Sequence, residues 1–307
     1  MVGLTGKGKI RGIIPALPTF FTEGNRISYR DLRSAINFAV ECGASGIAAL
    51  VIAGEFYKMS EDERRKVAFA AIKAAEGRLP VYIGVSHSGL KPAVDLAKHA
   101  ISNGADGVIL SPPYFYPMKK EIYETAASFV SEFCSACDCP VILQLFQTED
   151  ALPLSVAKLR DVLLESKNIE AIKIEGSNAI RMIRLIRRGF GSRISILGGM
   201  LGMNLAEELN SGSSGTIPGL SFSDVFVKAF NAFGGRTDDC GRILSRLEPY
   251  FSFTRSHFDQ FVAVEKELLV LRKVIANSRL RSPCIPLTDS QRFELRDRIL
   301  PACRFGW

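Results

Sequence analysis

Short apolar segments rich in β-branched residues alternate with longer amphipathic segments along most of the chain, and this alternation limits the fold more than any other feature. Eight apolar segments are predicted to be strands, at residues 13–17, 46–52, 80–85, 107–111, 140–146, 169–174, 194–198 and 214–219. The stretches between them, among them 29–42, 61–76, 92–103 and 154–165, are predicted to be helices. Apolar strands separated by helices are typical of a parallel sheet covered on both faces. Eight such units predict an α/β protein with a closed (β/α)8 TIM barrel.

The last part of the chain has a different character. From Asp238 onward no strand pattern occurs, and helical patterns cover residues 239–253, 258–277 and 289–301. We therefore expect a barrel over residues 1–235 and a C-terminal helical subdomain, packed on the barrel, over residues 236–307. Because no linker or low-complexity tract separates them, the second part is not expected to be an independent module.

The charge and the cysteine content of the chain indicate which kinds of molecule it binds and in which compartment it lies. The 307 residues carry a net charge of +7, but Lys and Arg are scattered through helical segments, so no nucleic-acid partner is expected. The N-terminal segment lacks the apolar core of a signal peptide, and no apolar run approaches the roughly 20 residues of a membrane helix. Seven cysteines, an odd number, fit a reducing compartment better than a disulfide framework. We therefore expect a cytoplasmic protein with no membrane partner.

Three of the cysteines could suggest a metal site. Cys134, Cys137 and Cys139 lie close together in the sequence, but no His or Cys pair follows at a spacing suited to zinc. We therefore expect no metal and no organic cofactor.

The segment NIEAIKIEG, residues 168–176, places a lysine inside an apolar strand. Lys173 and Glu175 are two residues apart, so their side chains are predicted to lie on one face of the strand. Active sites of (β/α)8 barrels lie at the C-terminal ends of the strands. A lysine that loses its hydration has a lowered pKa and becomes a nucleophile near neutral pH. The alternative is an ordinary lysine whose stem lies along the strand while its ammonium reaches solvent.

Four segments carry a resemblance to a known family: GIIPALPTFFTEGNRISYRDL at the first strand, AGEFYKMSEDERRKV after the second, GADGVILSPPYFYP at the fourth and NIEAIKIEG at the sixth. Together they resemble the dihydrodipicolinate synthase and N-acetylneuraminate lyase family of Schiff-base-forming class I aldolases, over nearly the whole chain. The resemblance puts Lys173 on the family's imine-forming lysine. It implies attack on the keto carbon of a pyruvate-like 2-oxo acid, after which the protonated imine acts as an electron sink. It also suggests a homotetramer built as a dimer of dimers.

The first departure from the family pattern concerns the carboxylate of the substrate. Where the family has two threonines that hold this carboxylate, the chain has Ile52 and Ala53, and it keeps only Gly54 and Glu55 of the motif. The hydroxyl donors are missing, but backbone N–H groups of the turn could still bind a carboxylate. We therefore expect residues 52–55 to contact the substrate.

The second departure concerns proton transfer. Gln144 stands where the family has a proton-shuttling tyrosine, and an amide cannot exchange a proton near neutral pH. Glu149 stands where the synthases have an arginine, so a second substrate carboxylate at this place would be repelled. Glu175 is the first candidate to replace the tyrosine, because a partly buried carboxyl group can have a raised pKa. A plain ion pair of Glu175 with Lys173 or a surface arginine is the alternative.

Loops at the expected barrel mouth supply the other candidate substrate-binding residues. Tyr57 could offer a phenol and His87 an imidazole, although both could equally serve packing or loop hydrogen bonding. Tyr114 lies where the resemblance implies a tyrosine directed toward a neighbouring subunit, and its loop could equally form an interface. Gly198 and Ile217 belong to segments that could form a phosphate-type cradle or simply allow tight turns.

The sequence therefore predicts a Schiff-base-forming lyase, an aldolase, that acts through Lys173 on a pyruvate-like 2-oxo acid or aldehyde substrate and is not a standard dihydrodipicolinate synthase. A 2-oxo acid dehydratase that uses the same imine is one alternative. A catalytically silent, ligand-binding barrel is another, because the family's proton shuttle is missing.

Overall fold

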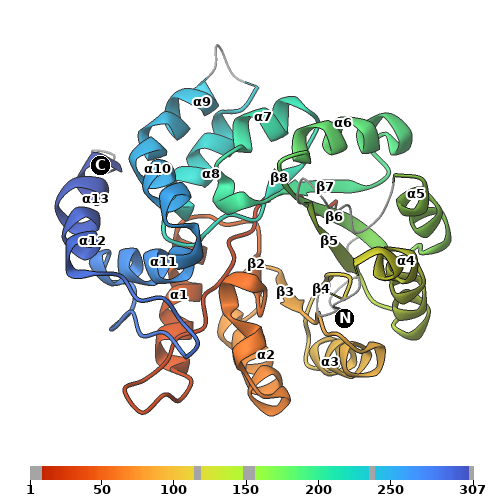
Figure 1. Cartoon of the computed structure of the whole chain (residues 1–307), viewed down its shortest axis with the longest axis horizontal. Coiled ribbons are helices and arrows are strands. Elements are labelled where there is room, and N and C mark those ends of the chain that lie inside the picture. Colours follow the sequence, from red (N-terminus) through yellow and green to blue (C-terminus); the bar gives the residue numbers. More distant parts are fainter. Residues whose placement is uncertain (1–8, 114–118, 148–155, 235–238, 304–307) are drawn as a thin grey trace.

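The computed structural model of the chain describes residues 9–113, 119–147, 156–234 and 239–303. These residues contain a sheet of eight parallel strands in the order β1-β8-β7-β6-β5-β4-β3-β2, with helices around it (Figure 1). The strands are β1 (Gly12–Ile13), β2 (Ile47–Ala49), β3 (Val81–Gly84), β4 (Gly107–Leu110), β5 (Val141–Gln147), β6 (Ile169–Gly176), β7 (Ser195–Gly198) and β8 (Gly215–Thr216). Each overlaps a predicted strand, and most are shorter than predicted.

The two edges of the sheet meet and close it into a barrel. Ala16, which follows β1, forms parallel bridges with Ala48 of β2 and with Gly219 after β8. The backbone N–H of Leu17 donates to the carbonyl oxygen of Ala48 at 2.8 Å, and the N–H of Ala48 donates to the carbonyl oxygen of Pro15 at 3.0 Å. The predicted (β/α)8 TIM barrel is therefore confirmed.

A helix follows each strand and packs on the outside of the barrel. These helices are α1 (Tyr29–Glu41), α2 (Glu61–Ala75), α3 (Leu90–Ser102), α4 (Lys119–Ala136), α5 (Val156–Glu165), α6 (Ala179–Phe190), α7 (Leu205–Asn210) and α8 (Ser223–Ala232). The α3 helix begins two residues before the predicted start at Pro92, because the first turn of a helix tolerates proline.

Alternate strand residues fill the inside of the barrel. One buried cluster combines inward residues from all eight strands and their ends, including Ile14, Ala48, Tyr82, Ile109, Ile142, Ala171, Leu197 and Ile217. On β6, Ala171 belongs to this inner cluster, whereas Ile172 and Ile174 belong to the outer cluster beneath the helices. Because side chains alternate along a strand, Lys173 and Glu175 share the inner face.

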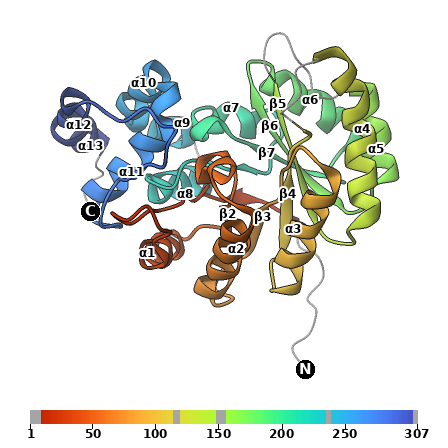
Figure 2. The ribbon, with the colours of Figure 1, turned by 60° about the horizontal axis from the view of Figure 1, so that its bottom comes forward.

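The C-terminal helices lie on one flank of the barrel, next to α8 and α1 (Figures 1 and 2). They are α9 (Asp239–Leu244), α10 (Glu248–Ser256), α11 (Phe261–Leu271), α12 (Asp289–Glu294) and α13 (Leu300–Cys303). Their buried side chains, such as Tyr250 and Leu295, form one cluster with Phe226 of α8 and Ile13 of β1. The expected boundary between residues 235 and 236 lies outside the described residues, so the division into 1–235 and 236–307 stays a prediction.

The C-terminal helices differ in their limits from the predicted ones. A 3₁₀ turn at Ser245–Leu247 separates α9 from α10, and a π-helical segment at Leu295–Ile299 joins α12 to α13. The helix predicted over 258–277 ends at Leu271, because Lys273 has a φ of 59° and leaves the right-handed helical conformation. No helix among the described residues is long and apolar enough to cross a membrane.

A fully buried ion pair connects the helical flank with the barrel. Nζ of Lys266, on α11, donates to Oε2 of Glu55 in the loop after β2 and to the carbonyl oxygen of Arg279. Nζ of Lys58 lies 2.7 Å from the other carboxylate oxygen of Glu55, and the ring of Phe21 lies beside Lys266. Burial lowers the pKa of Lys266, and the carboxylate of Glu55 opposes this effect by favouring the ammonium.

We expect Lys266→Met to reduce the free energy of unfolding by about 3–5 kcal/mol, because it removes one of the cations that compensate the buried carboxylate of Glu55. Lys66→Met is the matched control: Lys66 pairs with Asp62 on the surface, its side chain is 62% exposed, and its loss should cost less than about 1 kcal/mol. Urea denaturation of both variants measures the difference. Equal losses would show that the buried pair does not hold α11 to the barrel.

Candidate active site

The C-terminal ends of β5 and β6 bring three polar side chains together inside the barrel. Gln144 is the register partner of Lys173 between these two strands. Nζ of Lys173 lies 2.9 Å from Oε2 of Glu175, and the same oxygen accepts a hydrogen bond of 2.8 Å from Nε2 of Gln144. All three residues are buried. The residues predicted to be catalytic are thus in direct contact with one another.

The loop after β7 holds the other carboxylate oxygen of Glu175. Oε1 accepts a hydrogen bond of 2.9 Å from the backbone N–H of Met200. Gly199 provides the space, because a Cβ atom at this position would lie 2.3 Å from Oε1 of Glu175. Donors from β5, β6 and the loop after β7 therefore fix the carboxylate beside the ammonium of Lys173, where it can accept a proton without moving.

The turn after β2 offers fewer backbone donors than the sequence suggested. Ile52, Ala53 and Gly54 form a 3₁₀ turn, in which Ala53 joins the inner cluster of the barrel and Ile52 is 41% exposed. The N–H groups of Gly54 and Glu55 already donate to the carbonyl oxygens of Val51 and Ile52. Within the described structure, the N–H groups of Ile52 and Ala53 are the donors of this turn that could still bind a substrate carboxylate.

Glu55 and Tyr57 have partners within the protein. Both carboxylate oxygens of Glu55 are bound by the lysines Lys58 and Lys266, an arrangement that favours a structural role over contact with a substrate. Tyr57 is half exposed, and its ring packs edge-on against Phe56 with a centroid distance of 5.7 Å. Partial burial raises the pKa of Tyr57, so its phenol stays protonated at neutral pH.

His87 is engaged by neighbouring residues of its own loop and of α2. Its Nδ1 accepts a hydrogen bond of 3.0 Å from the N–H of Gly89, and its Nε2 lies 3.6 Å from Oε1 of Glu61. Neither partner belongs to the group around Lys173. Tyr114 and Glu149 lie outside the described residues.

Ile217 and Gly198 occupy opposite faces of the barrel wall. Ile217 joins the inner cluster, whereas the missing side chain of Gly198 would point outward, where a Cβ atom would lie 1.7 Å from Oε2 of Glu208 on α7. The space at Gly198 is thus taken by a carboxyl group of the protein.

Reasoning from the sequence missed Glu208, although the sequence contained a signal for it. Leu205, Glu208 and Leu209 are the buried residues of α7, and their i, i+3, i+4 spacing puts the acid on the apolar face of that helix. Burial raises the pKa of Glu208 to about 8, the N–H of Gly199 opposes the rise, and the charge of Glu175 adds to it.

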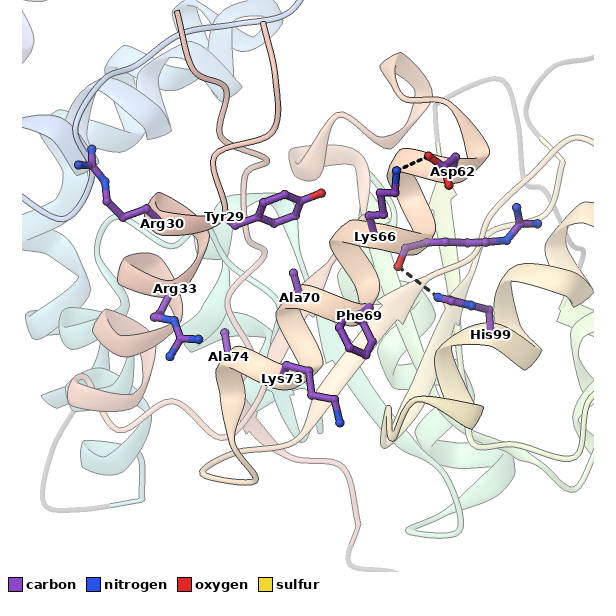
Figure 3. A pocket seen from close by; sticks show the side chains of 11 residues that line it. Tyr29, Arg30, Arg33, Asp62, Lys66, Phe69, Ala70, Lys73, Ala74 and His99 are labelled. Atoms are coloured by element: carbon purple, nitrogen blue, oxygen red, sulfur yellow. Dashed lines mark hydrogen bonds and ion pairs between the residues drawn. The ribbon is translucent and has the colours of Figure 1, made fainter. Parts of the chain in front are cut away.

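Two other features lie away from this group of residues. Burial raises the pKa of Cys134 to about 11 and that of Cys139 to about 12, and the described part of the chain contains no group of His, Cys, Asp and Glu residues that could hold a metal ion. A hollow on the outer surface is lined by α1, α2 and α3, with Tyr29, Phe69 and His99 among its residues (Figure 3). None of the predicted site residues lines it.

Two comparisons cover nearly the whole chain. Residues 9–301 match the model of the dihydrodipicolinate synthetase family. The crystal structure of dihydrodipicolinate synthase from Rhodopseudomonas palustris superposes with a TM-score of 0.86 and 26% sequence identity, over 95% of this chain and 97% of that one.

Curated relatives match over different lengths. The L-2-keto-3-deoxyarabonate dehydratase of Azospirillum brasilense is 26% identical over 93% of this chain and 92% of its own. A protein from Escherichia coli, named as a probable 2-dehydro-3-deoxy-D-pentonate aldolase, is 30% identical over 54% of each chain. This chain spans only 43% to 63% of the length of five of the curated relatives that it matches. Since the family model covers residues 9–301, the chain belongs to the dihydrodipicolinate synthetase family.

Proposed function

We propose that the chain is a lyase of the class I aldolase type, which forms a Schiff base between Lys173 and a pyruvate-like 2-oxo acid. The observation that carries this proposal is the buried ion pair of Lys173 and Glu175 at the C-terminal end of β6, where barrel enzymes have their active sites. Membership of the family supports it, because relatives are named as an aldolase and as a dehydratase.

Glu175 is the proposed acid and base of Schiff-base formation. Lys173 must be a neutral amine to add to the keto carbon, and Glu175, at 2.9 Å, accepts the proton that it loses. Addition forms the C–N bond, and one proton of the added nitrogen passes to the former carbonyl oxygen, which gives the carbinolamine. Glu175 then returns the proton to the carbinolamine hydroxyl, which leaves as water and gives the protonated imine.

Gln144 is the proposed support of this carboxylate. Its amide cannot transfer a proton at neutral pH, but it donates to the same oxygen of Glu175 that faces Lys173, while the N–H of Met200 holds the other oxygen. The task of the family's tyrosine is thus divided, since the carboxylate moves the proton and the amide orients the carboxylate.

The same imine serves two reactions of a 4-hydroxy-2-oxo acid. In aldol cleavage a base removes the proton of the 4-hydroxyl, the C3–C4 bond breaks, and its electron pair passes to the imine, which leaves an aldehyde and an enamine. In dehydration, removal of the C3 proton gives an enamine, whose electron pair expels the 4-hydroxyl, and this hydroxyl takes up a proton and leaves as water. A dehydratase is the second candidate function, because the Azospirillum brasilense dehydratase matches 93% of this chain, whereas the Escherichia coli aldolase matches only 54% of it.

A catalytically silent barrel is the candidate from another class. Such a protein would keep Lys173 to bind a ligand after losing the family's tyrosine, whose place is taken by Gln144. Only a lysine that reacts forms an imine that borohydride can reduce, so chemical trapping separates this candidate from the two enzymes.

We expect pyruvate and sodium borohydride together to add the mass of the reduced adduct to the peptide that contains Lys173. Lys173→Arg should abolish this addition, because a guanidinium stays charged and cannot form the imine. Lys167→Arg, in the loop before β6, is the matched control and should be labelled like the wild type. Peptide mass spectrometry locates the adduct, and label on another lysine, or no label with a broad panel of 2-oxo acids, contradicts the proposal.

We expect Glu175→Gln to lower turnover of a 4-hydroxy-2-oxo acid substrate by about 10²- to 10⁴-fold, the usual cost of losing a general acid and base, and to slow imine formation less. The pH–rate profile should become flat on the limb that the carboxylate controls. Tyr57→Phe and His87→Ala are the controls. Normal turnover of Glu175→Gln, together with loss of activity in either control, would assign the proton transfer to the loops instead.

The assembly and location of the protein are also proposals. We propose a cytoplasmic homotetramer built as a dimer of dimers, on the strength of the family resemblance and of the aromatic loop around Tyr114, which lies outside the described residues. Multi-angle light scattering at micromolar concentration should give four times the chain mass of 33.7 kDa. A monomer under these conditions contradicts the proposal.

A further inference from the structure

The inner face of β5 opens to solvent at Phe146. Ile142 belongs to the inner cluster of the barrel, whereas Leu143 and Leu145 belong to the outer cluster. Because side chains alternate along a strand, Gln144 and Phe146 share the inner face with Ile142. The exposed fraction along this face rises from 0% at Ile142 and 3% at Gln144 to 40% at Phe146. Phe146 therefore marks the place on β5 where the packed interior ends and the mouth of the barrel begins.

Phe146 lies beside the carboxylate that contacts Lys173. It is the register partner of Glu175 between β5 and β6, and Nζ of Lys173 lies 2.9 Å from Oε2 of Glu175. An imine on Nζ therefore begins next to this pair of residues. Below the pair the barrel is filled by its inner cluster, so the chain of a bound 2-oxo acid extends toward the open end, past Phe146.

Other apolar side chains lie at the same end of the barrel. Met200, whose N–H donates to Oε1 of Glu175 at 2.9 Å, is partly exposed. Ile52, in the turn after β2, is 41% exposed. Exposed apolar side chains favour an apolar ligand, because contact with it removes apolar surface of both from water.

The lysines near the ends of β2 and β6 are paired with carboxylates of the protein. Lys173 pairs with Glu175, and Lys58 and Lys266 both pair with Glu55. Within the described structure, none of these three ammonium groups is left to bind a second acidic group of a substrate. The carboxylate of Glu175 would repel such a group.

We propose that Phe146 is a specificity-determining residue, and that the site takes a 2-oxo acid whose chain is apolar beyond C4 in preference to one that ends in a second acidic group. The proposal rests on the proposed function of Lys173, because Phe146 can select a substrate only if the imine forms beside it. It applies equally to the aldolase and to the dehydratase, since both use the same imine.

Competition between 2-oxo acids for Lys173 tests the proposal. The protein is incubated with equal concentrations of pyruvate and 2-oxo-4-phenylbutanoate, or of pyruvate and 2-oxoglutarate. Sodium cyanoborohydride is present in each mixture, because its hydride reduces an imine to a stable secondary amine in preference to reducing a ketone. Mass spectrometry of the peptide that contains Lys173 gives the ratio of the two adducts. None of the three acids has a 4-hydroxyl group, so neither cleavage nor dehydration changes them.

In the wild type we expect the phenylbutanoate adduct to exceed the pyruvate adduct by about tenfold, and the 2-oxoglutarate adduct to fall below it by about the same factor. Phe146→Ser should lower the preference for the phenyl chain by about fivefold, because the contact between the two rings is lost. Phe146→Leu keeps an apolar side chain and should keep most of the preference. The intrinsic reactivity of each acid is the same with every variant, so the change between variants measures the effect of Phe146.

Phe233→Ser is the matched control and should show the wild-type ratios. Phe233 is also 40% exposed, but it lines a hollow with Lys9 and Arg11, which precede β1 at the opposite end of the barrel.

Two results overturn the proposal while leaving the proposed function intact. The first is a preference for the phenyl chain that is absent in the wild type or unchanged in Phe146→Ser. The second is a 2-oxoglutarate adduct that exceeds the pyruvate adduct. Absence of every adduct on Lys173, with pyruvate included, would refute the proposed function and this proposal together.

Discussion

The ion pair between Lys173 and Glu175 is the interaction around which the candidate site is built. Two opposite charges inside a barrel are costly unless each is well compensated. The amide of Gln144 and the N–H of Met200 supply the donors that the carboxylate needs, and Gly199 supplies the space. The carboxylate of Glu175 is thus held by residues of three elements: the C-terminal end of β6, the neighbouring strand β5 and the loop after β7.

Most of the fold could be predicted from the sequence, because local patterns of apolar and polar residues indicate its strands and helices. Apolar runs marked all eight strands, and the alternation along NIEAIKIEG put Lys173 and Glu175 on one face, as the 2.9 Å contact between them requires. The limits of the C-terminal helices were less accurate, because they depend on single residues such as Lys273, whose left-handed conformation has no clear signal in the sequence.

Those partners of charged residues that are distant in the sequence could not be predicted. Glu55 and Lys266 are 211 residues apart, and no local pattern indicates that they pair. The Gly-Glu pair after β2 looked like part of a carboxylate-binding turn, but the carboxylate of Glu55 ties the barrel to α11 instead. Glu208 was missed for a related reason, since α7 has only six residues and its apolar face is hard to recognise.

The replacement of a tyrosine by Gln144 changes how protons can be handled near Lys173. A phenol can exchange a proton itself, whereas an amide can only fix the group that does. In the proposed reaction the exchange falls to Glu175, whose carboxylate is held by donors from β5, β6 and the loop after β7. A barrel that places its proposed acid and base on a strand therefore gains fixed geometry, because Glu175 needs no loop movement to reach Lys173.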